Sequence, residues 1–274
     1  MSLIIISADL YESGRAVAEK AAAKLNYRLI DRELLTEAAA RNEVPEAELK
    51  RALAENPSLF GMRVRPWRRA LAVIQKTVLE RLLADDAVCH GLGAHLYVVG
   101  VSHALKVRVL ADAEKEAAVL AEQERIPAEK ATKRLEQRKQ LRRRWSRSAF
   151  GVDETDPGLY DLVIGLSNID LDEAVQTICD TASYRKFQPM SWSQKCLADL
   201  ELAARVRTVL LERFPDLKVS ADGGTLVVEV RAMKREKRRK AEAIKEMAGR
   251  IAGVEYVEVH VVNDIFRQAA ESFR

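Results

Sequence analysis

The stretch Leu3-Ile4-Ile5-Ile6-Ser7, together with the helical pattern over residues 13–25, decides the fold of this chain. The apolar run predicts a buried strand, and the residues after the next turn have the spacing of an amphipathic helix. A strand that leads directly into a helix N-terminus is the layout of a phosphate site, because unpaired backbone N–H groups and the positive end of the helix dipole meet there. The turn between them is therefore the first candidate for an anion-binding site.

The residues of this turn match a phosphate loop poorly. Such a loop has the pattern G-x-x-x-x-G-K-[ST], in which glycines let the backbone wrap the phosphates, the lysine supplies charge and the hydroxyl contacts magnesium. One register places Asp9 and Gly14 at the glycines and Arg15 at the lysine, and the register one residue earlier keeps neither glycine. Glu12 would also place a carboxylate near a triphosphate, and a like-charge pair at about 4 Å in an effective dielectric of about 20 costs on the order of 4 kcal/mol.

A wider set of residues around the turn carries a family resemblance. It includes Ile6-Ser7, Gly14-Arg15, Val17-Ala18 and Ile30-Asp31-Arg32-Glu33-Leu34. With these residues the chain resembles the cytidylate kinase-like family, P-loop relatives of the nucleoside monophosphate kinases. The loop of that family usually reads Gly-Ser-Gly-Gly-Arg, whereas this chain has Tyr11-Glu12-Ser13-Gly14-Arg15. The resemblance implies a P-loop kinase-like parallel sheet with helices on both faces, and ATP and magnesium as cofactors if the protein is active.

Two later positions depart from the arginine pattern of that family. Leu92, within Gly91-Leu92-Gly93-Ala94, stands where relatives have an arginine that faces the nucleotide. Glu116 stands on the first turn of a later helix, where relatives often have an arginine. The resemblance therefore implies a site that has lost positive charge at both positions.

A strongly basic helical pattern begins near residue 128, where the family has its lid. Kinase lids use arginines to neutralise the charge that spreads over the moving phosphoryl group. The same arginines could belong to a solvated face that pairs with neighbouring glutamates through i, i+4 contacts, and the two interpretations are equally favoured. Trp145 shares the apolar spacing of Leu135 and Leu141, so a core position is favoured over stacking on a base.

The resemblance, carried residue by residue onto this chain, implies a candidate kinase site. Ser13, Gly14 and Arg15 would contact the nucleotide, and Asp31 and Gly91 would lie at the phosphate acceptor. The catalytic charges would come from Arg15 and from four arginines of the lid, Arg138, Arg142, Arg143 and Arg147.

Composition and charge limit the other classes of function. With 274 residues the chain has room for one large or two smaller domains, and its net charge of +4 argues neither for nor against nucleic acid. The 3 cysteines and 4 histidines lack metal-ligand spacing, so no metal site is assigned. The odd cysteine count, with neither a signal peptide nor an apolar run of roughly 18 residues, predicts a cytoplasmic protein without a transmembrane segment.

Two domains are expected. Alternating strands and helices predict an α/β domain over residues 1–185, and a polar linker follows at 186–195. Residues 196–274 read as a small αββαβ α+β domain, with helices at about 197–214 and 232–252.

Short stretches of the second domain carry a further resemblance. Asp222-Gly223 at the hairpin turn and Ile251-Ala252-Gly253-Val254-Glu255-Tyr256-Val257 near the end resemble the BON domain, a module linked to attachment to membrane surfaces or partners. The basic run 234–240 suits an acidic protein, a lipid headgroup or nucleic acid, although a solvated helix start is favoured.

Three functional hypotheses are consistent with these patterns. The favoured one is a degenerate kinase fold that lacks efficient phosphoryl transfer and acts as a nucleotide-binding, anion-binding or interaction module. The second is an active ATP-dependent kinase of cytidylate or another small phosphate acceptor. The third is a binder of nucleic acid or acidic surfaces built on the two basic helices, which a steep salt dependence would identify.

Overall fold

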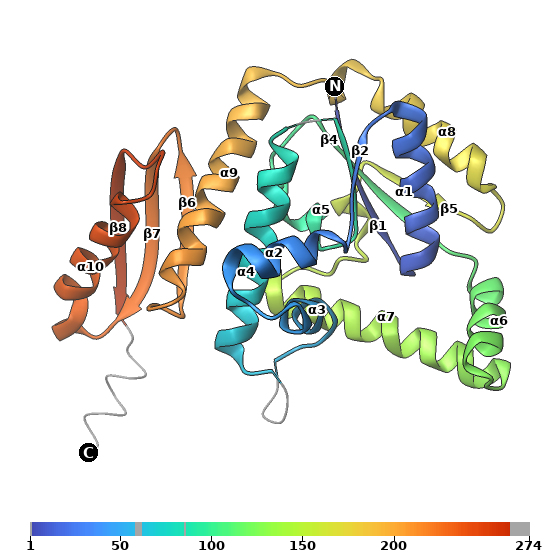
Figure 1. Ribbon diagram of the computed structural model, residues 1–274, viewed down its shortest axis with the longest axis horizontal. Helices are drawn as coiled ribbons and strands as arrows, with labels where there is room; N and C mark the ends of the chain where they lie inside the picture. The colour runs from blue at the N-terminus through green and yellow to red at the C-terminus, as the bar shows by residue number, and fades with distance from the viewer. Residues whose placement is uncertain (1, 58–61, 85, 264–274) are drawn as a thin grey trace.

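The computed structural model describes residues 2–57, 62–84 and 86–263. Its larger part is a 5-stranded parallel sheet with helices on both faces (Figure 1). From edge to edge, the strands are β2 (Arg28–Ile30), β3 (Ala87–His90), β1 (Leu3–Ala8), β4 (Ala104–Leu110) and β5 (Leu162–Gly165). The predicted parallel α/β sheet is confirmed, and β1, the strand that the sequence marks most clearly, lies at its centre.

In the described residues, no helix is both long enough and apolar enough to cross a membrane.

The helices of this part alternate with the strands along the chain, as the sequence pattern predicts. The helices are α1 (Tyr11–Leu25), α2 (Leu34–Asn42), α3 (Glu46–Ala54), α4 (Val64–Leu82), α5 (Ala94–Tyr97), α6 (Ala113–Glu124), α7 (Ala128–Phe150), α8 (Leu171–Ala182) and α9 (Ser191–Leu210).

Side chains of β1 alternate between two hydrophobic cores. Ile4 and Ile6 pack with α1 and α8, whereas Leu3 and Ile5 belong to a core built largely by α4. Successive side chains of a strand point to opposite faces, so a strand covered on both faces needs a continuous apolar run. The unbroken isoleucine stretch therefore places β1 between two layers of helices.

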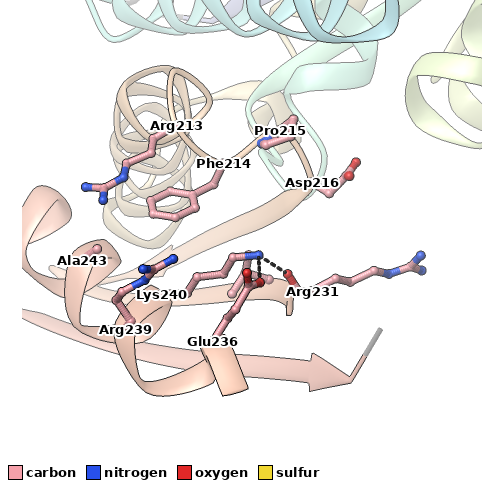
Figure 2. Close-up of a pocket in the computed structure, with 10 residues that line it drawn as sticks. Arg213, Phe214, Pro215, Asp216, Arg231, Glu236, Arg239, Lys240 and Ala243 are labelled. Carbon is pink, nitrogen blue, oxygen red and sulfur yellow. Dashed lines mark hydrogen bonds and ion pairs between the residues drawn. The ribbon is translucent and has the colours of Figure 1, made fainter. Parts of the chain in front are cut away.

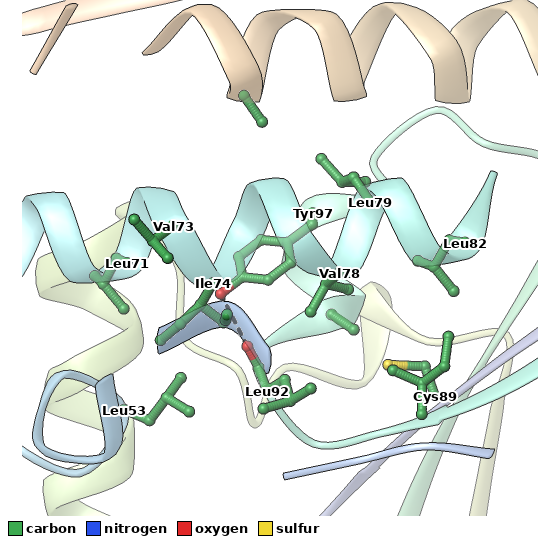
Figure 3. Close-up of a cluster of buried hydrophobic side chains, with 14 of the residues drawn as sticks. Leu53, Leu71, Val73, Ile74, Val78, Leu79, Leu82, Cys89, Leu92 and Tyr97 are labelled. Carbon is green, nitrogen blue, oxygen red and sulfur yellow. Dashed lines mark hydrogen bonds between the residues drawn. The ribbon is translucent and has the colours of Figure 1, made fainter. Parts of the chain in front are cut away.

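The core on the α4 face contains the residue that replaces an expected arginine (Figure 3). Leu92 is 4% exposed and packs with Ile74 and Val78 of α4. Its carbonyl oxygen accepts a 2.8 Å hydrogen bond from the hydroxyl of Tyr97. Leu92 is thus part of the core, and its side chain contributes nothing polar to a nucleotide site.

The helices α6 and α7 form a hairpin whose two ends are held differently (Figure 1). Near the hairpin turn, a small apolar cluster joins the helices through Leu120 and Leu135. Toward the end of α7, Trp145 is fully buried, and its indole N–H donates a 2.7 Å hydrogen bond to the carbonyl oxygen of Ala52 in α3. The favoured core position of Trp145 is confirmed, and the basic helix is anchored to the body of the protein.

A smaller sheet follows, with strand order β6 (Leu217–Asp222), β7 (Thr225–Ala232) and β8 (Tyr256–Asn263). β6 and β7 form an antiparallel hairpin, and β8 pairs parallel to β7. Helix α9 and the last helix, α10 (Lys237–Gly249), pack on this sheet. The order of elements is αββαβ as expected, and residues 264–274 of the expected second domain lie outside the described residues.

The helix α9 begins inside the stretch that the sequence suggests is a linker. It starts at Ser191 rather than near residue 197, and one of the polar residues there, Ser193, is buried instead of solvated. Ser193 is completely buried, and its hydroxyl oxygen accepts a 3.2 Å hydrogen bond from the backbone N–H of His103. The expected linker is therefore shorter on its C-terminal side.

Helix α9 contributes to two hydrophobic cores, the one around α4 and the one of the small sheet. Leu197 and Ala204 belong to the core around α4, whereas Leu202 and Val206 belong to the core of the small sheet. The two sheets are therefore joined by a shared helix. The second helix expected for the C-terminal unit, over residues 232–252, is α10. It begins later than expected, at Lys237, because Ala232 is the last residue of β7.

Replacing Trp145 by phenylalanine tests the anchoring of α7. The change removes the buried hydrogen bond to Ala52 and leaves unfilled space, so we expect the free energy of unfolding to fall by about 1–3 kcal/mol. Trp192→Phe is the matched control, because Trp192 is 64% exposed, and its effect should stay within about 0.5 kcal/mol. Urea denaturation of both variants measures the difference, and equal effects would contradict the anchoring role.

Candidate functional site

The connection between β1 and α1 consists of Asp9 and Leu10 alone. Helix α1 begins at Tyr11, two residues earlier than expected, so the segment 11–14 forms its first turn. The N–H of Gly14 donates to the carbonyl oxygen of Leu10 at 3.3 Å. Among the described residues, none from 9 to 25 has a positive φ. The backbone here is a short strand-to-helix turn, without the left-handed conformations that glycines would supply to an open loop.

The carboxylate of Asp9 is occupied by two basic side chains. Arg108 of β4 is 6% exposed, forms an ion pair with Asp9, and donates a 2.9 Å hydrogen bond to the hydroxyl oxygen of Ser7. Lys139 of α7 lies 3.4 Å from the other oxygen of Asp9. The parallel pairing of β1 and β4 explains the first contact, because it places Arg108 opposite Ser7.

Ser13 and Gly14, predicted to contact the nucleotide, are both engaged by the protein itself. The Ser13 hydroxyl donates a hydrogen bond to the carboxylate of Glu116, on the first turn of α6. Gly14 lies where a Cβ would approach Ala8 Cβ and His90 Nε2 to 2.5 Å. Gly14 therefore allows close packing of α1 on β1 and β3.

Arg15 and the two predicted acceptor residues lie at the carboxyl end of the sheet. The Arg15 guanidinium is 2.7 Å from a carboxylate oxygen of Glu19 and 3.7 Å from one of Asp31. Asp31 is 5% exposed and accepts a 2.9 Å hydrogen bond from the backbone N–H of Glu33. Gly91 follows β3 with φ +70°, and its N–H donates to Ile6 at 2.9 Å. The structure thus brings Arg15 and Asp31 together.

An aromatic contact covers the end of β3 beside this pair. The ring of Tyr11 lies 4.7 Å from that of His90, and the guanidinium of Arg32 stands 3.7 Å from the centre of the Tyr11 ring. Burial lowers the pKa of His90 to about 4, and the nearby Arg32 acts in the same direction. His90 is therefore neutral at neutral pH and is packed between α1 and the sheet.

Each of the four predicted lid arginines of α7 has a carboxylate partner. The pairs are Arg138 with Glu124 at 3.1 Å, Arg142 with Glu154 at 2.7 Å, and Arg143 and Arg147 with Asp153 at 3.0 and 2.9 Å. The guanidinium of Arg143 holds the pKa of the Asp153 carboxyl well below its usual range. Pairing of the basic face is confirmed, but the partners come from the end of α6 and the segment after α7 rather than from i, i+4 neighbours.

The four lid arginines do not converge on one point, because their ion pairs are spread along α7. Arg138 and Arg147 are nine residues apart, which is about 14 Å along an α-helix. Arg142 differs from the others because its partner Glu154 is only 1% exposed. Burial raises the pKa of Glu154, and the charge of Arg142 opposes that rise.

Next to Glu154, a buried histidine contributes shape rather than charge. His95 lies 4.0 Å from Glu154 and stacks on the ring of Tyr160 with centroids 5.3 Å apart. Burial lowers the pKa of His95 well below its ordinary value, so the contact with Glu154 is not an ion pair at neutral pH. Beside the ion pair between Arg142 and Glu154, His95 is therefore an uncharged packing group.

A groove of about 740 Å³ opens beside the β1–α1 turn. Leu10 and the start of α6 form one wall, and α7 forms the other. Two lysines, Lys133 and Lys139, are balanced in its lining by Glu129 and Glu136. The groove has the size of a ligand site, but its lining has no excess of positive charge. The part of the chain that the structure describes contains no group of three His, Cys, Asp or Glu side chains that could hold a metal ion.

Comparison with known families identifies the larger part of the chain. A model of the cytidylate kinase-like family matches residues 3–168, which span β1 to β5 and the hairpin of α6 and α7. The chain belongs to the cytidylate kinase-like family. No curated protein sequence matches it.

Solved structures resemble this cytidylate kinase-like protein in fold. An uncharacterized protein from Eubacterium ventriosum is 20% identical, with a TM-score of 0.50, over 68% of this chain and 100% of its own. A shikimate kinase from Bacteroides thetaiotaomicron is 12% identical, with a TM-score of 0.43 over 67% and 99% of the two chains. A dephospho-CoA kinase from Campylobacter jejuni is 12% identical, with a TM-score of 0.35 over 66% and 97%. The first likeness concerns the fold alone, and the other two are too low to support an argument.

Several residues of this site were not predicted from the sequence. Arg108 stands in an alternating strand pattern, and Asp9 appears only as a mismatch in the loop. Asp153 and Glu154 follow the lid helix, where they read as part of the approach to the last strand. The available signal was an arginine inside an inner strand of an α/β sheet, since a buried guanidinium needs a carboxylate partner.

Substitution of Gly14 by alanine tests the close packing of α1. The added methyl group would collide with Ala8 and His90, so we expect the free energy of unfolding to fall by about 1–3 kcal/mol. Gly249→Ala is the control, because a Cβ on that helical glycine would meet nothing within 4 Å. The control should leave stability unchanged or raise it by about 0.5–1 kcal/mol. Urea unfolding of both variants decides, and an undiminished stability of Gly14→Ala would contradict the packing argument.

Proposed function

We propose that this member of the cytidylate kinase-like family lacks efficient phosphoryl transfer and acts as a binding or interaction module with a kinase fold. One observation carries the proposal: the side chains that would bind phosphate are paired with carboxylates of the same chain. The C-terminal unit, residues 196–274 with a BON-like order of elements, would supply a second contact surface, and the composition favours action in the cytoplasm.

The turn after β1 supports this proposal most strongly. Asp9 pairs with Arg108 and Lys139, so both cations beside the turn are already held by a carboxylate of the chain. Glu12 adds a second carboxylate on the first turn of α1, and a like-charge pair at about 4 Å in an effective dielectric of about 20 costs on the order of 4 kcal/mol, which is roughly a thousandfold in affinity. The hydroxyl of Ser13 donates to the carboxylate of Glu116, and Ala16 stands at the position where a phosphate loop has its magnesium-binding hydroxyl. These residues do not fit magnesium-bound ATP.

The ion pairs of the lid arginines differ in burial, so they support the proposal to different degrees. The pairs of Arg143 and Arg147 with Asp153 lie at the surface, where both guanidinium groups are exposed and such pairs contribute little to stability. They could open for an anionic ligand. Arg142 is different, because removing it from the buried Glu154 would leave an unpaired interior charge at a cost of about 3–5 kcal/mol. We infer that Arg142 holds the lid in place and does not follow a phosphoryl group.

An active ATP-dependent kinase of cytidylate or another small acceptor is the alternative, and one observation favours it. Arg15 lies 3.7 Å from the buried Asp31 at the carboxyl end of the sheet, where open α/β sheets bind their ligands. In that case Arg15 would be the residue on which turnover depends, with Arg138, Arg142, Arg143 and Arg147 as the lid and Asp31 and Gly91 near the acceptor.

A single-turnover assay separates the two candidates. Protein in excess over γ-labelled ATP is mixed with magnesium and each nucleoside monophosphate in turn, and we expect no labelled diphosphate above the protein-free reaction. Transfer to any acceptor would contradict the proposal. If transfer occurs, Arg15→Ala should abolish it, whereas Arg144→Ala should not, because Arg144 lies exposed on α7 without an ion pair among the described residues.

A further inference from the structure

A basic pocket of about 360 Å³ lies in the C-terminal unit, away from the β1–α1 turn (Figure 2). The segment after α9, residues 213–216, forms one side, and β7 with the start of α10 forms the other. Four of its lining residues are cationic, namely Arg213, Arg231, Arg239 and Lys240. All of the lining residues lie between positions 213 and 243, so the pocket belongs to the C-terminal unit alone.

The acidic residues of the pocket offset only part of this charge. Asp216 forms an ion pair with Arg68 of α4, which is not part of the lining, whereas Glu236 lies 3.3 Å from the ammonium of Lys240 and offsets that charge. In the part of the chain that the structure describes, neither Arg213 nor Arg239 forms an ion pair. The lid arginines of α7 that were predicted to be catalytic are each paired, so these two guanidinium groups are the more available to an external anion.

Charge at the start of α10 points in the same direction. Its first turn carries Lys237, Arg238, Arg239 and Lys240 and no acidic residue. The N-cap residue is Glu236, whose side chain pairs with Lys240 and does not cap the N–H groups of the helix. Positive side chains at the positive end of a helix dipole are unfavourable. By contrast, α8 begins with a capping box formed by Asp170 and Glu173. An anion in the pocket would offset the repulsion among the cations and that with the helix dipole.

We propose that this pocket binds the phosphate group of a small phosphorylated ligand. The two guanidinium groups of Arg213 and Arg239 match the several acceptor oxygens of a phosphate. A nucleobase is a poorer fit, because the one aromatic ring of the lining, Phe214, is itself only 6% exposed. A lipid headgroup presents the same phosphate chemistry, so the experiment separates the two sources. The proposal does not depend on whether the kinase-like part transfers phosphoryl groups.

Calorimetric titration of the full chain with pyrophosphate, without magnesium, tests the site. We expect saturable binding that Arg213→Gln and Arg239→Gln each weaken by about tenfold or more. Arg238→Gln is the matched control, since it removes the same charge from the same helical turn, yet Arg238 is turned outward to Glu242 with its side chain 92% exposed. The control should weaken binding by less than about twofold.

A second arm uses phosphatidylcholine vesicles with and without phosphatidic acid. If the protein binds the phosphatidic acid vesicles but not pyrophosphate, and Arg213→Gln and Arg239→Gln abolish that binding, the phosphate belongs to a lipid headgroup. Binding of neither probe would overturn the proposal. So would equal losses in Arg238→Gln and in the pocket variants, because they would reveal only a diffuse basic surface. Circular dichroism of each variant excludes a folding defect as the cause of a loss.

Discussion

The ion pair between Asp9 and Arg108 determines what the carboxyl end of the central strand can do. Arg108 reaches that end because β4 places it opposite Ser7, and it is almost completely buried. Leaving it without a carboxylate would cost about 3–5 kcal/mol, so Asp9 stays in place as long as the sheet does. A carboxylate of the chain thereby occupies the cations at the point where a phosphate needs N–H groups and free positive charge.

The lid repeats this arrangement farther along the chain. Trp145 anchors the end of α7 to α3, and the nearby Arg142 is held by the buried Glu154. These contacts fix the helix near the body, while Arg143 and Arg147 stay at the surface with Asp153. A kinase lid has to bring its cations to a moving phosphoryl group. Here the cations already have partners, which is consistent with a fold kept for binding rather than transfer.

Local patterns were enough to predict the elements but not their long-range contacts. The isoleucine run identified β1, and the hairpin signal at Asp222-Gly223 identified β6 and β7. The burial of Ser193 against His103 could not be predicted, because its polar neighbourhood resembles a linker and its partner is 90 residues away. The pair of Asp9 with Arg108 was missed because the two residues are 99 positions apart. Glu154 was missed as the partner of Arg142 because it follows the end of α7 rather than lying one turn away on the helix. Gly14 matched the family pattern, but its role in packing depends on His90 from another strand.

The affinity for magnesium-bound ATP tests the central claim most directly. Calorimetry is best done in the Arg213→Gln/Arg239→Gln background, so that the C-terminal pocket does not contribute to the signal. If carboxylates of the chain hold the phosphate-binding positions, ATP should not saturate the protein at millimolar concentration, with or without magnesium. Micromolar, magnesium-dependent binding in that variant would contradict the account and favour an active kinase.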